Sequence, residues 1–189
     1  MDVSRDAAWE LFCEWTESDS LRKHALAVEA SMRAYARIWG EDEERYAVTG
    51  LVHDLDYERY PDLETGHPRH AVSELERLGY PQELIDAVAG HAEFMNVPRE
   101  TPLAKTLYAV DELSGFVAAC AVVRPTGIRG MTPKSVKKKL KQPSFAAGVN
   151  RDEVRRGAEE LGVDFDEHVA FVIAAMEERA AALGLEGSE

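Results

Sequence analysis

The sequence predicts an all-α protein. Over most of its 189 residues, apolar side chains recur every three or four positions, which is the spacing of one face of an α-helix. Prolines and several glycines stand where these periodic stretches begin or end, and no stretch alternates apolar and polar residues convincingly enough for a strand. Hydrophobic residues make up 45% of the chain, which is enough for an ordinary core and argues against disorder as the main state.

Eight helices are predicted from these recurring apolar positions, each set of which forms a stripe along one helix face. In chain order they span approximately residues 4–17, 20–40, 41–55, 68–78, 81–94, 101–124, 151–161 and 165–183. The first has Ala8, Leu11 and Phe12 on one stripe, and the third opens at an acidic run that suits the positive N-terminal end of a helix. Between the third and fourth helices, residues 56–68 read as a polar loop with two prolines and a glycine.

Prolines and glycines set the remaining helix ends. Pro68 and Pro81 suit the first turns of the fourth and fifth helices, and Thr101 caps the sixth before another first-turn proline. Gly162 and Gly184 end the last two helices. These signals predict a helical bundle with a C-terminal helical extension.

The amino-acid composition of the chain changes after residue 125. Residues 126–133 are rich in glycine and proline, and residues 134–141 are strongly basic. We therefore expect a helical core over residues 1–125, with a basic loop and C-terminal helices of residues 126–189 packed on that core. The lysines of the basic run either form an electropositive rim for an anionic substrate or pair with acidic neighbours.

The charge excludes several classes of function. Lys and Arg number 22 against 35 Asp and Glu, so the formal net charge is −13. Such a chain is repelled by nucleic-acid backbone and attracts cations, so no nucleic-acid polymer is expected as a partner. The longest apolar stretch, residues 103–123, is interrupted by Lys105, Asp111 and Glu112, and the N-terminus lacks a secretory pattern. Two cysteines without CxxC spacing complete the expectation of a cytoplasmic protein that binds no membrane; the oligomeric state stays open.

Three polar residues on apolar helix faces point to a buried ion. Asp111 lies in the middle of what should be the most buried helix, where an unpaired carboxylate would cost several kcal/mol. His91 continues an apolar stripe of the fifth helix, and His24 shares a face with Leu21 and Val28. Side chains from three helices therefore converge on the interior.

The adjacent pair His53-Asp54 completes this group at the end of the third helix. Near a helix end, neighbouring side chains can approach one ion from different directions. Imidazole nitrogen together with carboxylate oxygen suits Fe, Mn, Co, Ni or Zn rather than Ca²⁺. The absence of cysteine ligands excludes a structural zinc finger.

This order of residues resembles the signature of the HD-domain superfamily of metal-dependent phosphohydrolases. That signature has an early His, a His-Asp pair and a later Asp on a long helix, matched here by His24, His53-Asp54 and Asp111. Many members add two histidines in between, which His67 and His91 match. The resemblance covers residues 20–125 and implies a helical bundle around the metal site.

The resemblance implies a two-metal site. His24, His53, Asp54 and Asp111 would hold the first ion, and His67 and His91 the second, with Asp54 as the bridging and catalytic residue. The cofactor would be two divalent ions of Fe, Mn, Co or Ni, with Mg or Zn as further options. The substrate would be a small-molecule phosphoester, a nucleotide or a nucleotide derivative, attacked by a metal-activated water.

Several secondary assignments accompany this interpretation. Lys23 is the candidate substrate contact, because Arg22 and Lys23 point in different directions and only one can face the pocket. The loop acids Asp56, Glu58 and Asp62 do not match the spacing of members that use four ligands and a protein acid. His70 competes with His67 for the second metal, and His168 is expected to be structural.

Two other functions stay open. Some HD-fold proteins use two irons to activate oxygen with the same types of ligand, and sequence does not separate them from hydrolases. A non-catalytic module that binds metal or nucleotide for signalling is the second alternative, because no general acid is identifiable.

Overall fold

A computed structural model describes residues 3–188. Within them the structure contains helices and turns and no strand, so the predicted all-α class is confirmed. The helices are α1 (Arg5–Trp15), α2 (Asp19–Trp39), α3 (Glu43–Val52), α4 (Arg69–Arg77), α5 (Gln82–His91), a 3₁₀ turn η1 (Glu93–Met95), α6 (Pro102–Val122), α7 (Pro133–Leu140), α8 (Arg151–Leu161), α9 (Phe165–Glu177) and α10 (Ala180–Leu183).

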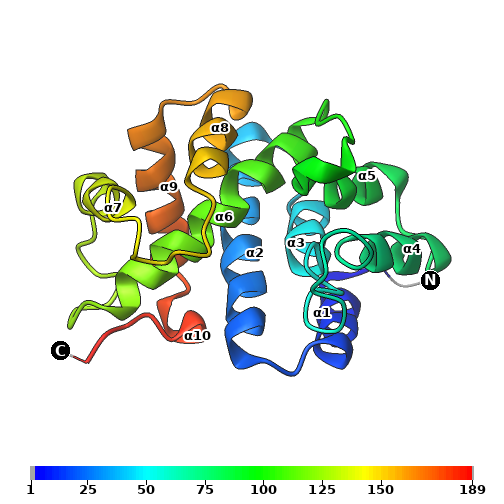
Figure 1. Ribbon diagram of the computed structural model, residues 1–189, viewed down its shortest axis with the longest axis horizontal. Helices are drawn as coiled ribbons and strands as arrows, with labels where there is room; N and C mark the ends of the chain where they lie inside the picture. The colour runs from blue at the N-terminus through cyan, green and yellow to red at the C-terminus, as the bar shows by residue number, and fades with distance from the viewer. Residues whose placement is uncertain (1–2, 189) are drawn as a thin grey trace.

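The two 21-residue helices α2 and α6 cross at the centre of the molecule. As Figure 1 shows, α1, α3, α4 and α5 lie on one side of this crossing, and α7, α8 and α9 lie on the other. Each side has its own cluster of buried apolar side chains. Leu26 of α2 packs against both clusters, so α2 joins the two halves.

Most predicted helix ends agree with the structure, because the capping residues act as expected. Thr101 accepts a hydrogen bond from the backbone of Ala104, and Gly40, Gly162 and Gly184 take the left-handed conformation just past α2, α8 and α10. The third helix is shorter than predicted and ends at Val52. His53 and Asp54 therefore lie in the first turns after it, which frees both side chains to face the interior.

The basic run after residue 132 is a helix that the sequence analysis missed. A capping box of Thr132 and Ser135 starts α7, and its buried side chains Val136 and Leu140 are four residues apart. Two apolar positions among lysines are too weak a stripe to predict a helix. The last predicted helix is interrupted at residues 178–179, which separates α9 from α10.

His168 is structural, as expected. It is buried, its Nε2 lies 3.0 Å from the carbonyl oxygen of Ala109, and its Nδ1 lies 2.6 Å from the hydroxyl of Tyr35. Burial lowers its pKa, so the neutral imidazole is favoured. The C-terminal helices are thereby tied to α2 and α6. The division of the chain at residue 125 stays a prediction.

None of the helices over residues 3–188 combines the length and apolarity needed to cross a bilayer.

The packing of α8 on α6 depends on Gly157. A Cβ added at Gly157 would lie 2.6 Å from the Cα of Ala109, which is a backbone atom that a rotamer change cannot move. Gly157→Ala is therefore expected to lower the free energy of unfolding by about 1–3 kcal/mol, despite the better helix propensity of alanine. Urea denaturation measures this change. Gly148→Ala is the control, because its added Cβ would meet no atom within 4 Å; equal stability of the two variants would contradict the prediction.

Candidate metal centre

Five segments of the chain bring the six predicted ligands together. His24 comes from α2, His53 and Asp54 follow α3, His67 precedes α4, His91 ends α5, and Asp111 lies in α6. Their ligand atoms form two groups, each with all atoms within 4.8 Å of one another. One group is His24, His53 and Asp111, and the other is Asp54, His67 and His91.

The first group converges on one oxygen of Asp111. His24 Nε2 lies 2.9 Å from Asp111 Oδ1, and His53 Nε2 lies 3.3 Å from the same oxygen. His53 is fully buried, and both partners are largely shielded from solvent. Two imidazoles and a carboxylate are a suitable partial shell for a divalent transition metal.

The second group converges on one oxygen of Asp54. His67 Nε2 and His91 Nε2 lie 3.5 and 3.7 Å from Asp54 Oδ1. These two nitrogens are 3.2 Å apart, and both histidines are buried.

Asp54 stands between the groups. Its Oδ1 faces the second group, whereas its Oδ2 lies 3.4 Å from His53 Nε2 and 3.7 Å from His24 Nε2 in the first group. One carboxylate thus presents a separate oxygen to each set of ligands. This is the arrangement needed for a carboxylate that bridges two ions.

The opposite ring nitrogens fix the orientation of the buried imidazoles. His53 Nδ1 donates to the carbonyl of Gly50 at 2.8 Å, and His91 Nδ1 donates to the carbonyl of Val88. His67 Nδ1 donates to Asp56 Oδ1 at 2.8 Å. With their protons assigned to Nδ1, the neutral rings turn Nε2 lone pairs into the centre, as metal-binding histidines do. His53 Nε2 is moreover a buried atom without a hydrogen-bond partner in the described chain, so the donor set fits a bound cation.

The electrostatics of the cluster agree with this fit. Burial alone would raise the pKa of Asp111, but the imidazoles of His53 and His24 outweigh it and hold that pKa well below its usual range. Burial would likewise lower the pKa of His53, but Asp54 and Asp111 raise it well above normal. The cluster therefore favours ionised carboxylates with positive charge between them, which a metal ion supplies.

Comparison with known proteins shows the family. The HD domain family matches residues 21–115, which contain all six of these side chains. The chain belongs to the HD domain family. It is also 31% identical over 98 residues to Ribonuclease Y of Oleidesulfovibrio alaskensis, a match that covers 52% of this chain and 18% of that protein. No solved structure matches.

Family membership places the chain in a superfamily with a common chemistry. HD domains form a superfamily of metal-dependent phosphohydrolases that bind divalent metal. The chain spans less than a fifth of the length of the ribonuclease that it matches. The specific reaction and substrate of this HD domain are therefore matters for proposal.

The loop acids hold the structure around the centre. Asp56 is fully buried and accepts hydrogen bonds from His67 and from the backbone of Ala71. Glu58 accepts from the backbone of Ser18, and Asp62 accepts from the backbone of Thr65. A cavity opens onto the metal centre, and none of these three acids lines it. None of them is therefore placed to act as an acid on a substrate there.

Asp56 orients the second group, which leads to a prediction. His67 and Ala71 donate to different oxygens of Asp56, and in Asp56→Asn one of these two oxygens is replaced by an NH2 group that cannot accept, so either His67 or Ala71 loses its partner. We expect the affinity for the second metal to fall about 10- to 100-fold while the first metal is bound as before. Calorimetric titration of metal-free protein with Mn²⁺ measures both affinities. Asp62→Asn, in the exposed part of the same loop, is the control, and equal affinities in the two variants would contradict this role.

A cavity of about 530 Å³ opens onto the metal centre. Beyond the ligands, three glutamates line it: Glu93 from η1, Glu112 from α6 and Glu153 from α8. Burial, followed by the neighbouring charge of Asp111, raises the pKa of Glu112 to about 7. The sequence analysis missed these acids; only the position of Glu112 directly after Asp111 could have pointed to one of them.

Lys23 is not brought to this cavity. Its Nζ pairs with Asp19 at 2.7 Å, and its side chain approaches Gly184 instead. Arg22 turns to the carbonyls of Cys13 and Thr16, so neither cation faces the ligands. His70, the competitor of His67, stacks on Tyr60 with ring centroids 3.9 Å apart and also lies outside the cavity lining.

Proposed function

We propose that this HD domain hydrolyses a small phosphomonoester with two divalent cations. The observation that carries the proposal is the position of Asp54, whose two oxygens each face a separate group of ligands. His24, His53 and Asp111 would hold one ion, and His67 and His91 the other. Such ions lower the pKa of a coordinated water and neutralise phosphate charge in the transition state. The mixed donor set of four imidazoles and two carboxylates suits divalent transition metals; we favour Fe, Mn, Co or Ni, with Mg or Zn as further candidates.

The lining of the cavity supports a small substrate with an organic leaving group. Tyr57, Leu63 and Phe94 line the cavity and are partly exposed, so they offer an apolar surface to a flat group such as a nucleobase. A volume of about 530 Å³ is within the usual range for a small-molecule site. A nucleoside monophosphate, with phosphate at the ions and base at this rim, is the substrate class we favour.

The charge of the cavity argues against a polyanion. Among residues 3–188, no Lys or Arg lines the cavity, whereas three glutamates do. A nucleic acid carries one charge per nucleotide and is normally bound through Lys and Arg. Although Ribonuclease Y is by its name a nuclease for RNA, this lining supports a monoester over an RNA chain.

A metal and substrate screen tests the proposal. Metal-free protein is loaded with Mn²⁺, Co²⁺, Ni²⁺, Fe²⁺ or Mg²⁺ and incubated with nucleoside monophosphates, dinucleotides and single-stranded RNA. We expect metal-dependent phosphate release from monophosphates and little cleavage of RNA. Cleavage of RNA alone would overturn the choice of substrate, and no hydrolysis with any metal would overturn the hydrolase.

The same screen separates the two alternatives. Because the ligand set also suits a pair of irons, oxygen consumption is followed in the iron-loaded protein. Oxygen uptake without phosphate release would favour an HD-fold di-iron oxygenase. Tight nucleotide binding without either reaction would favour a non-catalytic signalling module.

A further inference from the structure

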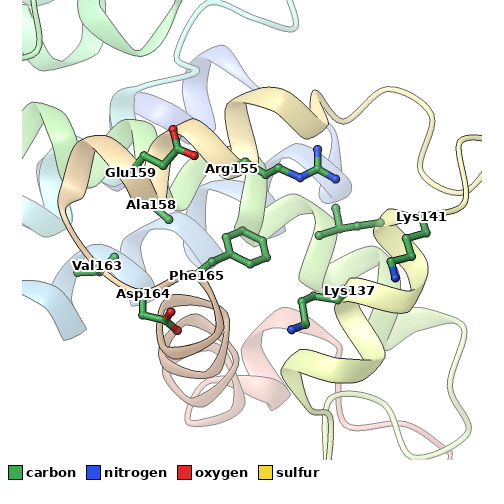
Figure 2. Close-up of a pocket in the computed structure, with 9 residues that line it drawn as sticks. Lys137, Lys141, Arg155, Ala158, Glu159, Val163, Asp164 and Phe165 are labelled. Atoms are coloured by element: carbon green, nitrogen blue, oxygen red, sulfur yellow. The ribbon is translucent and has the colours of Figure 1, made fainter.

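A second hollow, the C-terminal hollow, lies between α7, α8 and the start of α9. It has a volume of about 420 Å³ and is outside the matched family region (Figure 2). Its lining residues are Lys137, Leu140, Lys141, Arg155, Ala158, Glu159, Val163, Asp164 and Phe165. None of them lines the metal cavity, and α8 contributes different residues to each of the two sites.

Pairs of residues at helical spacing form the two walls of the hollow. Lys137 of α7 and Lys141, which caps the C-terminus of that helix, are four residues apart and so share one face. Arg155 and Glu159 have the same spacing at the opposite wall, α8. Both helices pack on α9, whose first residue, Phe165, presents its ring in the middle of the hollow (Figure 2).

The interior of the hollow is apolar. Of its apolar lining residues, Leu140 and Ala158 are buried and Phe165 is partly buried. An aromatic ring that remains accessible at the centre of a concave surface can stack on a flat apolar group. The interior therefore suits the body of an organic molecule, not an ion alone.

The charges of the hollow are separated. Figure 2 shows Lys137, Lys141 and Arg155 on one side of Phe165, and Glu159 and Asp164 on the other. Three cations at one end of a cavity are notable in a chain with a net charge of −13. They create a local site for an anionic group that the rest of the protein would repel.

The existing contacts of these cations leave them available to a ligand. Lys137 pairs with Asp166 at 2.6 Å, but both side chains are about half exposed, and such pairs contribute little to stability. Arg155 lies 3.5 Å from Asp152 Oδ1 and donates to the backbone carbonyl of Arg151 at 3.1 Å, both at the surface. Within residues 3–188, the ammonium group of Lys141 forms no hydrogen bond or ion pair.

We propose that the C-terminal hollow binds a small amphipathic anion, as a site separate from the metal centre. The phosphate or phosphonate head of this ligand contacts Lys137, Lys141 and Arg155, and its flat apolar body packs on Phe165 and Leu140. Arginine and lysine are the side chains that best recognise such heads. The volume of the hollow is in the range that small-molecule sites occupy.

1-Naphthylphosphonate is a suitable probe, because its carbon–phosphorus bond is not a phosphoester and it combines a flat body with an anionic head. Calorimetric titration of the metal-loaded protein measures its affinity. Lys141→Glu and Phe165→Ala should each weaken binding about tenfold, and inorganic phosphate should bind more weakly than the probe. Lys138→Glu is the matched control: it makes the same charge change on an exposed part of α7 outside the hollow, and should leave the affinity within about twofold.

Three outcomes would overturn the proposal. They are no binding of the probe by the wild-type protein, equal weakening by Lys138→Glu and Lys141→Glu, and loss of binding in Asp54→Ala. The last outcome would assign the probe to the metal centre. Retained affinity in Asp54→Ala, together with weakening by Phe165→Ala, supports a separate site even if the proposed phosphohydrolase reaction is not found.

Discussion

Asp54→Ala is expected to lower the kcat/KM of phosphomonoester hydrolysis by at least about 1000-fold. The variant removes the one carboxylate that presents an oxygen to each group of ligands, so both ions lose a ligand at once. The loss of bound ions removes their several kcal/mol of transition-state stabilisation, and each 1.36 kcal/mol corresponds to about tenfold in rate. Metal analysis of protein purified without chelator should show about two equivalents in the wild type and far less in the variant.

The control for this variant is Asp86→Ala. Asp86 is an exposed carboxylate on α5 that accepts a hydrogen bond from Gln82, and it lies outside the cavity lining. Both variants should keep a helical circular dichroism spectrum, because the charge of Asp54 serves the ions rather than the helices. Full activity or full metal content in Asp54→Ala would refute the two-metal proposal.

The sequence was most informative where polar residues interrupt an apolar pattern. Asp111 lies in the middle of α6 among buried side chains, and His91 is on the buried face of α5. A polar group in such a place needs a partner, so its position predicts a site. Asp54 lies beyond the end of α3, where the periodicity of a helix no longer predicts the direction of a side chain. Its bridging position was therefore implied only by the resemblance to the family.

The parts that were missed depend on tertiary packing. Whether Lys23 faces the cavity depends on how α2 rotates against its neighbours, and the structure pairs it with Asp19 instead. Glu93 and Glu153 reach the cavity from η1 and α8, which only the packing of the chain brings together. The role of Asp56 follows from its contact with His67, eleven residues away across a turn-rich loop.

His67→Ala tests whether the two groups hold separate ions. His67 contributes only to the second group, so about one of two metal equivalents should be lost while the first group keeps its ion. Activity should fall about 100-fold, since one ion still supplies part of the charge stabilisation. His70→Ala is the matched control, because that imidazole lies in the first turn of α4, three residues after His67, but stacks on Tyr60 outside the cavity.

The metal contents of the His67→Ala and His70→Ala variants together decide which histidine holds the second ion. Because His67 Nε2 faces Asp54 and its Nδ1 is fixed by Asp56, its removal opens the second group without disturbing the Asp111 side of the centre. Loss of both ions in His67→Ala would mean that the groups bind cooperatively as one unit. Loss of an ion in His70→Ala, with two retained in His67→Ala, would place the second ion elsewhere and refute the assignment of ligands.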